Sequence, residues 1–515
     1  MSSHQSGLVK HYLDHVLQRQ YLLADTSIAD FIIRTVQQNP AVQDAVCLLA
    51  SLHQESLRLG GNHPAGGAST AAQSSNNSAH VHQNEPYADS SKTYKRICDN
   101  LRTSAAGGYT EGEAMAGLFV VSAFLFRGGR GAWRQFLAVA AEWVWTVLHM
   151  SVDPAETILR CSDSQQFVIK TTFWFDILAS TTRLEAPRFI NIYRKLWSRR
   201  GAGAYIEGAS SSCVCGGGGG CGAECGSCPS PPQTQSALSM MSVMGCENAT
   251  ALAIAETSAL ACWKDVNLRH GTLSVPELVD RGRAIEAECL SPVPPTSQAQ
   301  VHPGPHTHHP QHPQQHPHSH PHHHHQQQQQ RTHPSTDGVL YTAPAPPNAN
   351  LAEKRRLTAD IFRATARVYL HSVLSGEQPG CPEIRDGVRE TIECLRCVPA
   401  GGAAGSSSSN VARSVLRSVV FGICLCGCLA DDGADRDFLL RRLDAEEQAE
   451  GVGNCASARS VMQEVWSRRA AAAAAAAANA GNAGGAGAGA GGAEVPPLSW
   501  RDATQQYAGE SLLLV

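Results

Sequence analysis

Three aspartates stand close together in the last quarter of the chain, in the run Asp431-Asp432-Gly433-Ala434-Asp435. Isoprenoid enzymes of the terpene-synthase type use a D-D-x-x-D spacing to hold Mg²⁺ and a diphosphate, because this ion prefers carboxylate oxygens. Such enzymes also need an Asn/Ser/Glu motif on a facing helix, and we find none. An all-α Mg-dependent isoprenoid enzyme using Asp431, Asp432 and Asp435 is therefore kept as an alternative. The favoured interpretation is a polar turn whose aspartates cap a helix over Arg436–Leu443.

Five cysteines between Cys213 and Cys228 form a C-x-C-x5-C-x3-C-x2-C array. Thiolates at such spacing can close a tetrahedral zinc site. The spacer is Gly216–Gly220, however, and neither Lys nor Arg stands between the cysteines. We interpret the array as a low-complexity insertion.

Histidines gather in residues 291–350, which hold 13 of the 23 in the chain. Neutral imidazoles there could bind Zn²⁺ or Ni²⁺ loosely, as an incidental affinity. Motifs for nucleophilic or phosphate chemistry are absent: the sequence contains no G-x-S-x-G, no Walker-type loop and no H-E-x-x-H. We assign no catalytic, cofactor-binding or metal residue, no cofactor, and no enzymatic role.

Helical periodicity fills the intervening sequence. Leu8–Tyr21 carries one apolar stripe, and Asn39-Pro40 offers an N-cap and a first-turn proline for a helix that stops at Gly60-Gly61. Further helical patterns cover Met115–Phe126, Trp133–Leu148, Phe167–Leu178, Ala251–Trp263, Val275–Leu290, Leu357–Leu374, Ile384–Leu395 and Val411–Leu429. Since strand-type alternation is hard to find, we predict an all-α protein.

Five biased segments hold 20 of the 27 prolines and divide this helical sequence. We expect one large helical domain with disordered interruptions that cannot bury enough apolar area to order themselves. Polyalanine at the start of the last segment could extend a helix from Trp466. The expected parts are 1–199 (loop at 60–90), a Gly/Cys/Ser/Pro insertion at 200–236, 237–290, a His/Pro/Gln insertion at 291–350, 351–469 (loop at 400–410), an Ala/Gly linker at 470–497, and 498–515.

Charge and hydropathy exclude two classes of partner. The net charge is −4 and no five consecutive basic residues occur, so the chain lacks the electrostatic footprint of a stand-alone DNA binder. The longest apolar stretches, Ala114–Phe126 and Val419–Ala430, are shorter than the ~20 residues that span a bilayer. No secretion signal opens the sequence. Basic groups at Arg199-Arg200 and Lys354–Arg356 are interpreted as solvated surface charge.

The cysteines are expected in a reducing compartment, because the sequence predicts no secretion. Outside the array they are scattered in apolar stretches, where a free cysteine behaves as a small buried hydrophobe. These positions include Cys47, Cys262, Cys424, Cys426 and Cys428.

Short motifs recur in an order that resembles the fungal-specific transcription factor domain, the helical regulatory region downstream of binuclear zinc-cluster DNA-binding domains. Each motif alone is weak, and their collinear order carries the resemblance. It runs through His11–Leu17, Asn39–Leu52, Arg130–Leu137, Trp174–Arg183, Met244–Cys246, Leu260–Lys264, Tyr369–His371, Ser375-Gly376, Gly427–Leu429, Asp435-Arg436, Val465-Trp466, Trp500–Asp502 and Leu512–Val515.

This resemblance implies a nuclear transcription regulator that acts by protein interaction, with effector sensing as a further option. Its partners would be transcriptional machinery or other regulators, a homodimer is an open option, and no membrane is involved. The family's six-cysteine basic module is not found in the sequence, so DNA contact and zinc would belong to a module not present in this chain. A DNA-free scaffold or dominant-negative regulator is the remaining alternative.

Overall fold

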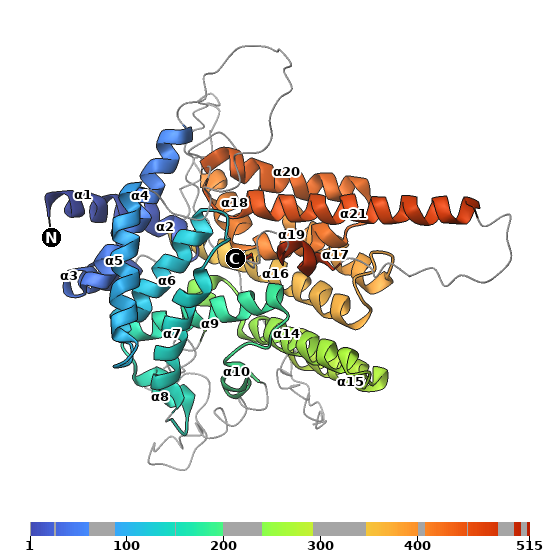
Figure 1. The fold of residues 1–515 in the computed structure, drawn as a ribbon, viewed down its shortest axis with the longest axis horizontal. Helices are drawn as coiled ribbons and strands as arrows, with labels where there is room; N and C mark the ends of the chain where they lie inside the picture. Colours follow the sequence, from blue (N-terminus) through green and yellow to red (C-terminus); the bar gives the residue numbers. More distant parts are fainter. Residues whose placement is uncertain are drawn as a thin grey trace, which may run out of the picture. The chain divides into compact units, whose positions relative to one another are not determined.

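Helices make up every regular element in the part of the chain that the structure describes (Figure 1). The computed structural model describes residues 2–24, 27–60, 88–149, 151–198, 239–291, 347–399, 407–450, 452–482, 499–505 and 512–515. The prediction of an all-α protein is confirmed. The cysteine array, the histidine tract and Arg199-Arg200 lie outside the described residues.

The first block, predicted as one apolar stripe, is divided in the structure. It forms α1 (Ser3–His11), a π-helical turn η1 (Tyr12–Val16) and α2 (Leu17–Gln20). A π-turn holds more residues than an α-turn, so Tyr12, Val16 and Leu17 can all face the core, and all three are buried. The helices that follow are α3 (Ser27–Gln38), α4 (Pro40–Gly60) and α5 (Ala88–Ser104).

The predicted cap of α4 is confirmed. The Asn39 side-chain oxygen accepts hydrogen bonds from the amides of Ala41 at 2.9 Å and Val42 at 3.2 Å. Helix α6 (Glu111–Phe126) is buried on nearly all sides and pairs closely with α7 (Trp133–His149). A Cβ at Gly117 would lie 2.7 Å from the Phe136 carbonyl oxygen, so glycine sets how closely α6 and α7 approach.

Helix α9 (Asp163–Arg183) lies at the centre of the packing. It contacts α6, α7, α14 and the short C-terminal helix α22 (Trp500–Gln505). Its neighbours in sequence are α8 (Pro154–Arg160), α10 (Ile190–Trp197) and α13 (Met241–Met244), followed by α14 (Asn248–Arg269), α15 (Val275–Ile285) and the π-turn η2 (Glu286–Leu290).

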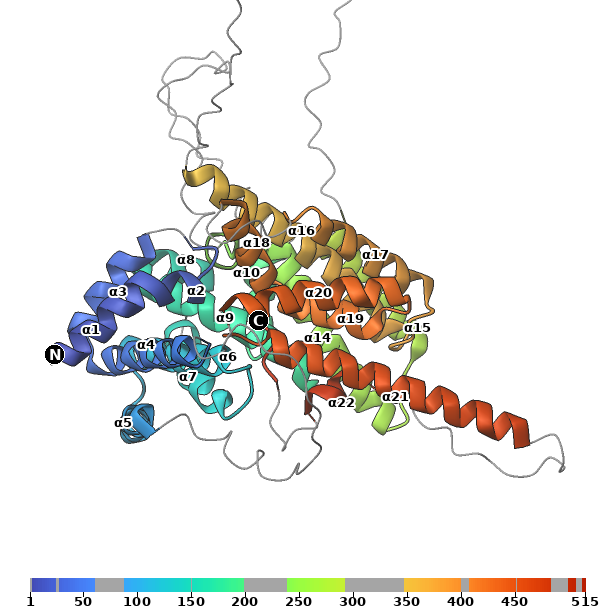
Figure 2. The same cartoon turned by 90° about the horizontal axis from the view of Figure 1, so that it is seen from above.

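The last third contains α16 (Pro347–Leu374), α17 (Pro382–Arg396), α18 (Ser407–Ser418), α19 (Val420–Leu429), α20 (Gly433–Glu450) and α21 (Cys455–Asn482). Figure 2 shows the end of α21 running past the other helices. The polyalanine start of the predicted 470–497 linker therefore extends a helix, as its composition indicated. Helices α5, α16 and α18 likewise begin inside the expected loops.

The prediction of one continuous helical pattern over Val411–Leu429 is wrong. The apolar pattern over Val411–Leu429 is two helices, α18 and α19, which bend by 65° around Val419. Val419 has φ −117° and ψ 24°, outside the helical region, and every residue of α19 is buried. Periodicity cannot reveal such a bend, because both helices are apolar on the faces that meet the core.

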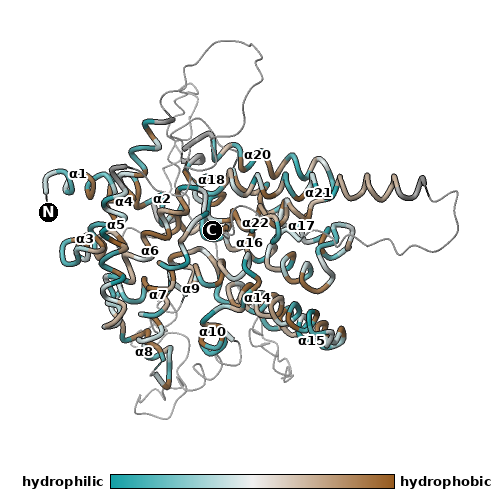
Figure 3. Tube along the Cα trace, viewed as in Figure 1, coloured by the Kyte–Doolittle hydropathy of each residue, from teal (hydrophilic) through white to brown (hydrophobic). Residues whose placement is uncertain are grey.

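Residues Met1–Ser291 and Asn348–Val515 form one unit with a continuous hydrophobic core. Residues 292–347 form a second unit, of which only Pro347 is described. Hydrophilic and hydrophobic stretches alternate along the helices (Figure 3). Among the described residues no single helix meets the length and hydropathy needed to cross a membrane, although the bent pair α18–α19 meets them when its two parts are combined.

Candidate functional site

The acidic cluster belongs to a helix start. The Asp432 carboxylate accepts hydrogen bonds from the amides of Ala434 at 2.6 Å and Asp435 at 3.3 Å, and so caps α20. Asp431 and Asp432 are exposed. Across the described residues, no group of three His, Cys, Asp or Glu side chains is arranged to hold a metal ion. The geometry matches the capping interpretation.

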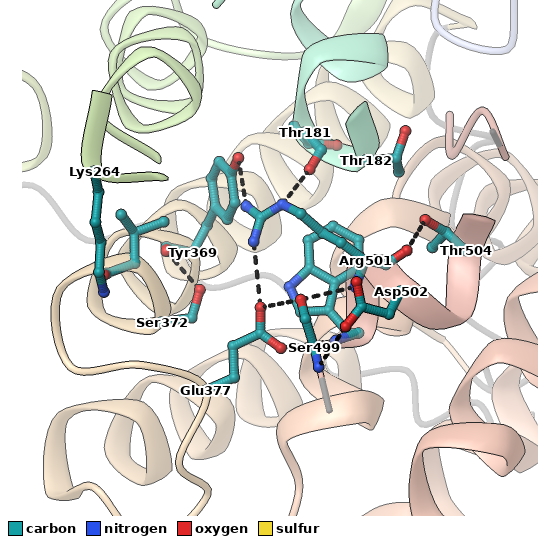
Figure 4. Close-up of polar contacts among 12 residues, drawn as sticks. Thr181, Thr182, Lys264, Tyr369, Ser372, Glu377, Ser499, Arg501, Asp502 and Thr504 are labelled. Atoms are coloured by element: carbon teal, nitrogen blue, oxygen red, sulfur yellow. Dashed lines mark hydrogen bonds and ion pairs between the residues drawn. The ribbon is translucent and has the colours of Figure 1, made fainter. Parts of the chain in front are cut away.

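A buried polar network centres instead on Arg501, near the start of α22 (Figure 4). Its guanidinium donates from Nε to the Thr181 carbonyl oxygen at 2.8 Å and from Nη2 to the Tyr369 hydroxyl at 2.9 Å. Its Nη1 lies 3.2 Å from Glu377 Oε1, and the two side chains are 9% and 12% exposed. One arginine thus joins α9, α16 and the loop before α17.

Glu377 collects further donors from the same C-terminal segment. The Ser499 hydroxyl donates to its Oε1 at 2.9 Å, and the Trp500 amide donates to its Oε2 at 2.7 Å. Burial raises the pKa of the Glu377 carboxyl, while the Arg501 guanidinium and these donors act in the opposite direction. The carboxylate therefore fixes the start of α22 against α16.

The network continues to α14. The Tyr369 and Ser258 hydroxyls lie 3.1 Å apart, and Lys264 Nζ donates to the Val373 carbonyl oxygen at the end of α16. Burial lowers the pKa of Lys264. The Arg501 guanidinium also lies over the Trp500 ring, 4.7 Å from its centroid. The hydrogen bonds of Tyr369 and Lys264 join segments more than a hundred residues apart in sequence.

A second acid, the half-buried Asp176, organises the end of α9. Its carboxylate accepts hydrogen bonds from the Tyr193 hydroxyl at 2.8 Å and from the amides of Arg188 at 3.1 Å and Phe189 at 3.3 Å. Burial raises the pKa of Asp176, and these donors lower it in part. Asp176 thereby fixes the turn that leads into α10.

Comparison with known proteins decides the family. Residues 7–514 match the family described as fungal specific transcription factor domain. The chain belongs to this family. The match spans nearly the whole described helical unit, so the fold in Figure 1 is that of a fungal-specific transcription factor domain.

Three curated relatives of the chain are named as transcription factors or transcription regulators. The chain is 27% identical over 245 residues to "Transcription factor dibT" of Pestalotiopsis microspora, covering 47% of this chain and 32% of that protein. It is 23% identical over 232 residues to "Trichothecene biosynthesis transcription regulator TRI10" of Trichoderma arundinaceum, covering 45% and 40%. It is 23% identical over 226 residues to "ustiloxin B cluster transcription factor ustR" of Aspergillus flavus, covering 44% and 30%. The matched regions thus span less than half the length of these relatives, and no solved structure matches.

The motifs that carried the family resemblance meet in space. Thr181 belongs to the run ending at Arg183, Tyr369 opens a second motif, and Arg501 stands in a third. Arg501 donates hydrogen bonds to both of the others (Figure 4). Sequence reasoning missed Glu377, which directly follows the Ser375-Gly376 motif. The sequence shows Glu377 only as an acidic residue next to a turn between two helices. A carboxylate at such a position is ordinarily exposed to solvent, so the sequence offers no reason to expect a buried ion pair.

The basic group on α16 corrects a further expectation. Arg355 was expected as solvated charge, but it is half-buried and donates to the carbonyl oxygens of Leu23 at 2.9 Å and Ser242 at 2.6 Å. Arg356 is exposed and pairs with Glu353 and Asp360. The interpretation as surface charge holds only for Arg356.

Proposed function

We propose that this chain is the regulatory domain of a fungal transcription regulator of the zinc-cluster type. The observation that carries the proposal is the family match over residues 7–514. Three relatives whose names describe transcription factors or regulators support it. In this proposal the domain works in the nucleus by binding transcriptional machinery or other regulators, either alone or as a homodimer.

DNA contact and zinc are assigned, in the same proposal, to a module outside these 515 residues. The net charge of −4 supports this division, because a DNA-binding surface needs clustered Lys and Arg to neutralise phosphates. No enzymatic role is proposed. The acidic cluster that suggested one has a cap role at Asp432, which weakens the isoprenoid alternative.

A reporter assay tests the proposal. Residues 1–515 are fused to a heterologous DNA-binding domain in a fungal host, and transcription from its site is compared with that from the DNA-binding domain alone. We expect at least a several-fold change in either direction. A fusion carrying Arg501→Met, which disrupts the network in Figure 4, tests whether the change in transcription requires the folded domain. Reporter output equal to that of the DNA-binding domain alone would favour an inert scaffold.

A further inference from the structure

Two cysteines stand three positions apart at the end of α17, in the run Cys394-Leu395-Arg396-Cys397. Cys394 is half-buried, Cys397 is exposed, and both are free thiols. A metal site with three or four ligands is not available to them, because no suitable group of three His, Cys, Asp or Glu side chains occurs in the described residues. In a reducing compartment, disulfides between such thiols are usually transient and redox-sensing. The pair is therefore suited to thiol–disulfide chemistry.

The end of α17 brings the two side chains to the same side of one turn. The Cys397 amide donates to the carbonyl oxygens of Cys394 at 3.2 Å and Glu393 at 3.3 Å. Cys397 has φ −70° and ψ −18°, so the last turn tightens toward the 3₁₀ form, in which side chains three residues apart eclipse each other. A four-residue turn closed in this way keeps its end Cα atoms within about 7 Å, and a disulfide joins Cα atoms about 4.4–6.8 Å apart. A disulfide therefore needs only a local adjustment of this turn.

The two thiols differ in their surroundings. Arg356 on α16, which also pairs with two carboxylates, lies close enough for its charge to interact with a Cys397 thiolate. Burial, and then the charges of Asp360 and Glu390, raise the pKa of Cys394 to about 11. Since the thiolate is the reactive form, the exposed Cys397 should react first with an oxidant. Cys394 then stands within the same turn as the second thiol.

We propose that Cys394 and Cys397 form a reversible disulfide when the domain meets a hydroperoxide such as H₂O₂. The Cys397 thiolate attacks a peroxide oxygen, the O–O bond breaks, and the hydroxide that leaves takes up a proton to become water. Cys397 is then a sulfenic acid. The Cys394 sulfur attacks this sulfenic sulfur, the S–O bond breaks, and the departing hydroxide takes the Cys394 proton as the S–S bond forms. Two thiols are oxidised and one H₂O₂ is reduced to two waters, and a dithiol reverses the change by exchange.

This disulfide would form where α17 meets α20. Arg442 on α20 donates to the carbonyl oxygens of Leu395 at 2.9 Å and Val398 at 3.2 Å. Arg396 lies over the Phe438 ring of α20, 5.4 Å from its centroid. Because these groups belong to the cysteine turn or directly follow it, a change in the turn is passed to α20. A resulting change in transcription rests on the proposed function, whereas formation of the disulfide does not.

Peptide mass spectrometry of the purified full chain tests the disulfide, because Arg396 lies between the two cysteines. Trypsin cleaves after Arg389, Arg396 and Arg413, so peptides 390–396 and 397–413 stay linked only when the disulfide has formed. The folded chain is treated with H₂O₂, and its remaining thiols are blocked with N-ethylmaleimide in urea before digestion. We expect the linked pair at submillimolar H₂O₂ and its loss when dithiothreitol is added before blocking. Oxidation of Cys397 to the sulfinic or sulfonic acid without a linked pair would overturn the proposal.

Serine variants separate the roles of the two thiols. Cys394→Ser should accumulate a Cys397 sulfenic acid that dimedone traps, and Cys397→Ser should leave Cys394 reduced at the same H₂O₂ concentration. Cys381→Ser, directly before α17, is the matched control and should form the linked pair as fast as wild type. If circular dichroism shows that Cys394→Ser is unfolded, Cys394→Ala replaces it.

Two results with these variants would refute the pairing. One is a Cys397 disulfide to another cysteine in preference to Cys394. The other is equal dimedone trapping at Cys397 in wild type and Cys394→Ser, since a second thiol in the turn should consume the sulfenic acid. These measurements use no reporter, so a failure of the disulfide is distinguished from a failure of the proposed function.

Discussion

Arg501 and Glu377 form a buried ion pair that attaches the C-terminal segment to the loop between α16 and α17, with 3.2 Å between Nη1 and Oε1. Taking two charges out of water is unfavourable, and the remaining hydrogen bonds of both groups offset part of that loss. Thr181, Tyr369, Ser499 and the Trp500 amide supply those bonds. Each member of the pair therefore depends on its partner for its place in the core.

Removing one member should destabilise the domain strongly. Arg501→Met leaves a buried carboxyl without its counter-charge, and we expect a loss of about 3–5 kcal/mol in the free energy of unfolding. Glu377→Gln should also destabilise it, and the double variant should lose less than the sum of the two. Urea unfolding followed by circular dichroism measures all four proteins.

An exposed pair serves as the matched control for this cycle. Arg389 and Asp386 lie 2.9 Å apart with side chains 57% and 61% exposed, so Arg389→Met should cost less than about 1 kcal/mol. Strict additivity of the two buried substitutions would show that Arg501 and Glu377 act independently.

The close packing of α19 on α16 depends on Gly422. A Cβ at this position would lie 2.5 Å from Thr365 Oγ1 on α16. Gly422→Ala should therefore destabilise the domain by about 1–3 kcal/mol, as overpacked cores do. At Gly433, in the first turn of α20, an added Cβ would meet no atom within 4 Å beyond the neighbouring residues and the helix's own backbone, so Gly433→Ala should be neutral or slightly stabilising. Thermal unfolding compares the two variants.

Thr365→Ala should rescue part of the Gly422→Ala loss. No hydrogen-bond partner for Thr365 Oγ1 is present in the described part of the chain, so removing that hydroxyl opens space without breaking a bond. If Thr365→Ala leaves the Gly422→Ala variant as unstable as before, the contact between these two positions is not the source of the effect.

The helices could be predicted from sequence far better than the contacts between them. Caps such as Asn39 and stripes such as Trp133–Leu148 are local patterns, and the structure reproduces them. The bend at Val419 and the π-turn at Tyr12 are set by tertiary packing, which periodicity does not record. The Arg501 network could not be predicted for the same reason. The sequence shows the order of the motifs that contain its members, but it does not show that these motifs contact one another in the folded domain.

Asp176 should give the domain a pH-dependent stability. Burial raises the pKa of this carboxyl in the folded state above its ordinary value of 3.8. The folded state then binds the proton more readily than the unfolded state, so this contribution to stability is complete below pH 3.8 and is lost as pH rises through the folded pKa. Wild type should therefore lose stability relative to Asp176→Asn as the pH rises from about 4.

Urea midpoints of the two proteins between pH 4 and 7 measure this difference. Tyr193→Phe removes a hydrogen bond that lowers the pKa of Asp176, so its midpoint should fall more steeply with pH. A wild type that gains stability over Asp176→Asn with rising pH would mean that the carboxylate form is the one the fold favours.

Thiol labelling distinguishes the cysteines of the α19 core from those at the surface. Cys424, Cys426 and Cys428 are fully buried, whereas Cys397 is exposed and Cys262, expected to be buried, is half-buried. Burial raises the pKa of Cys426 from 9.0 to about 12, which lowers its thiolate fraction at pH 8 about a thousandfold. Iodoacetamide should modify Cys397 within minutes and leave the three α19 cysteines unmodified until urea unfolds the chain, as measured by peptide mass spectrometry.

The Gly422→Ala variant should expose the same three cysteines at lower urea concentration, because it weakens the packing that covers them. Modification of Cys426 in the folded wild type at a rate near that of Cys397 would show that α19 opens locally without global unfolding.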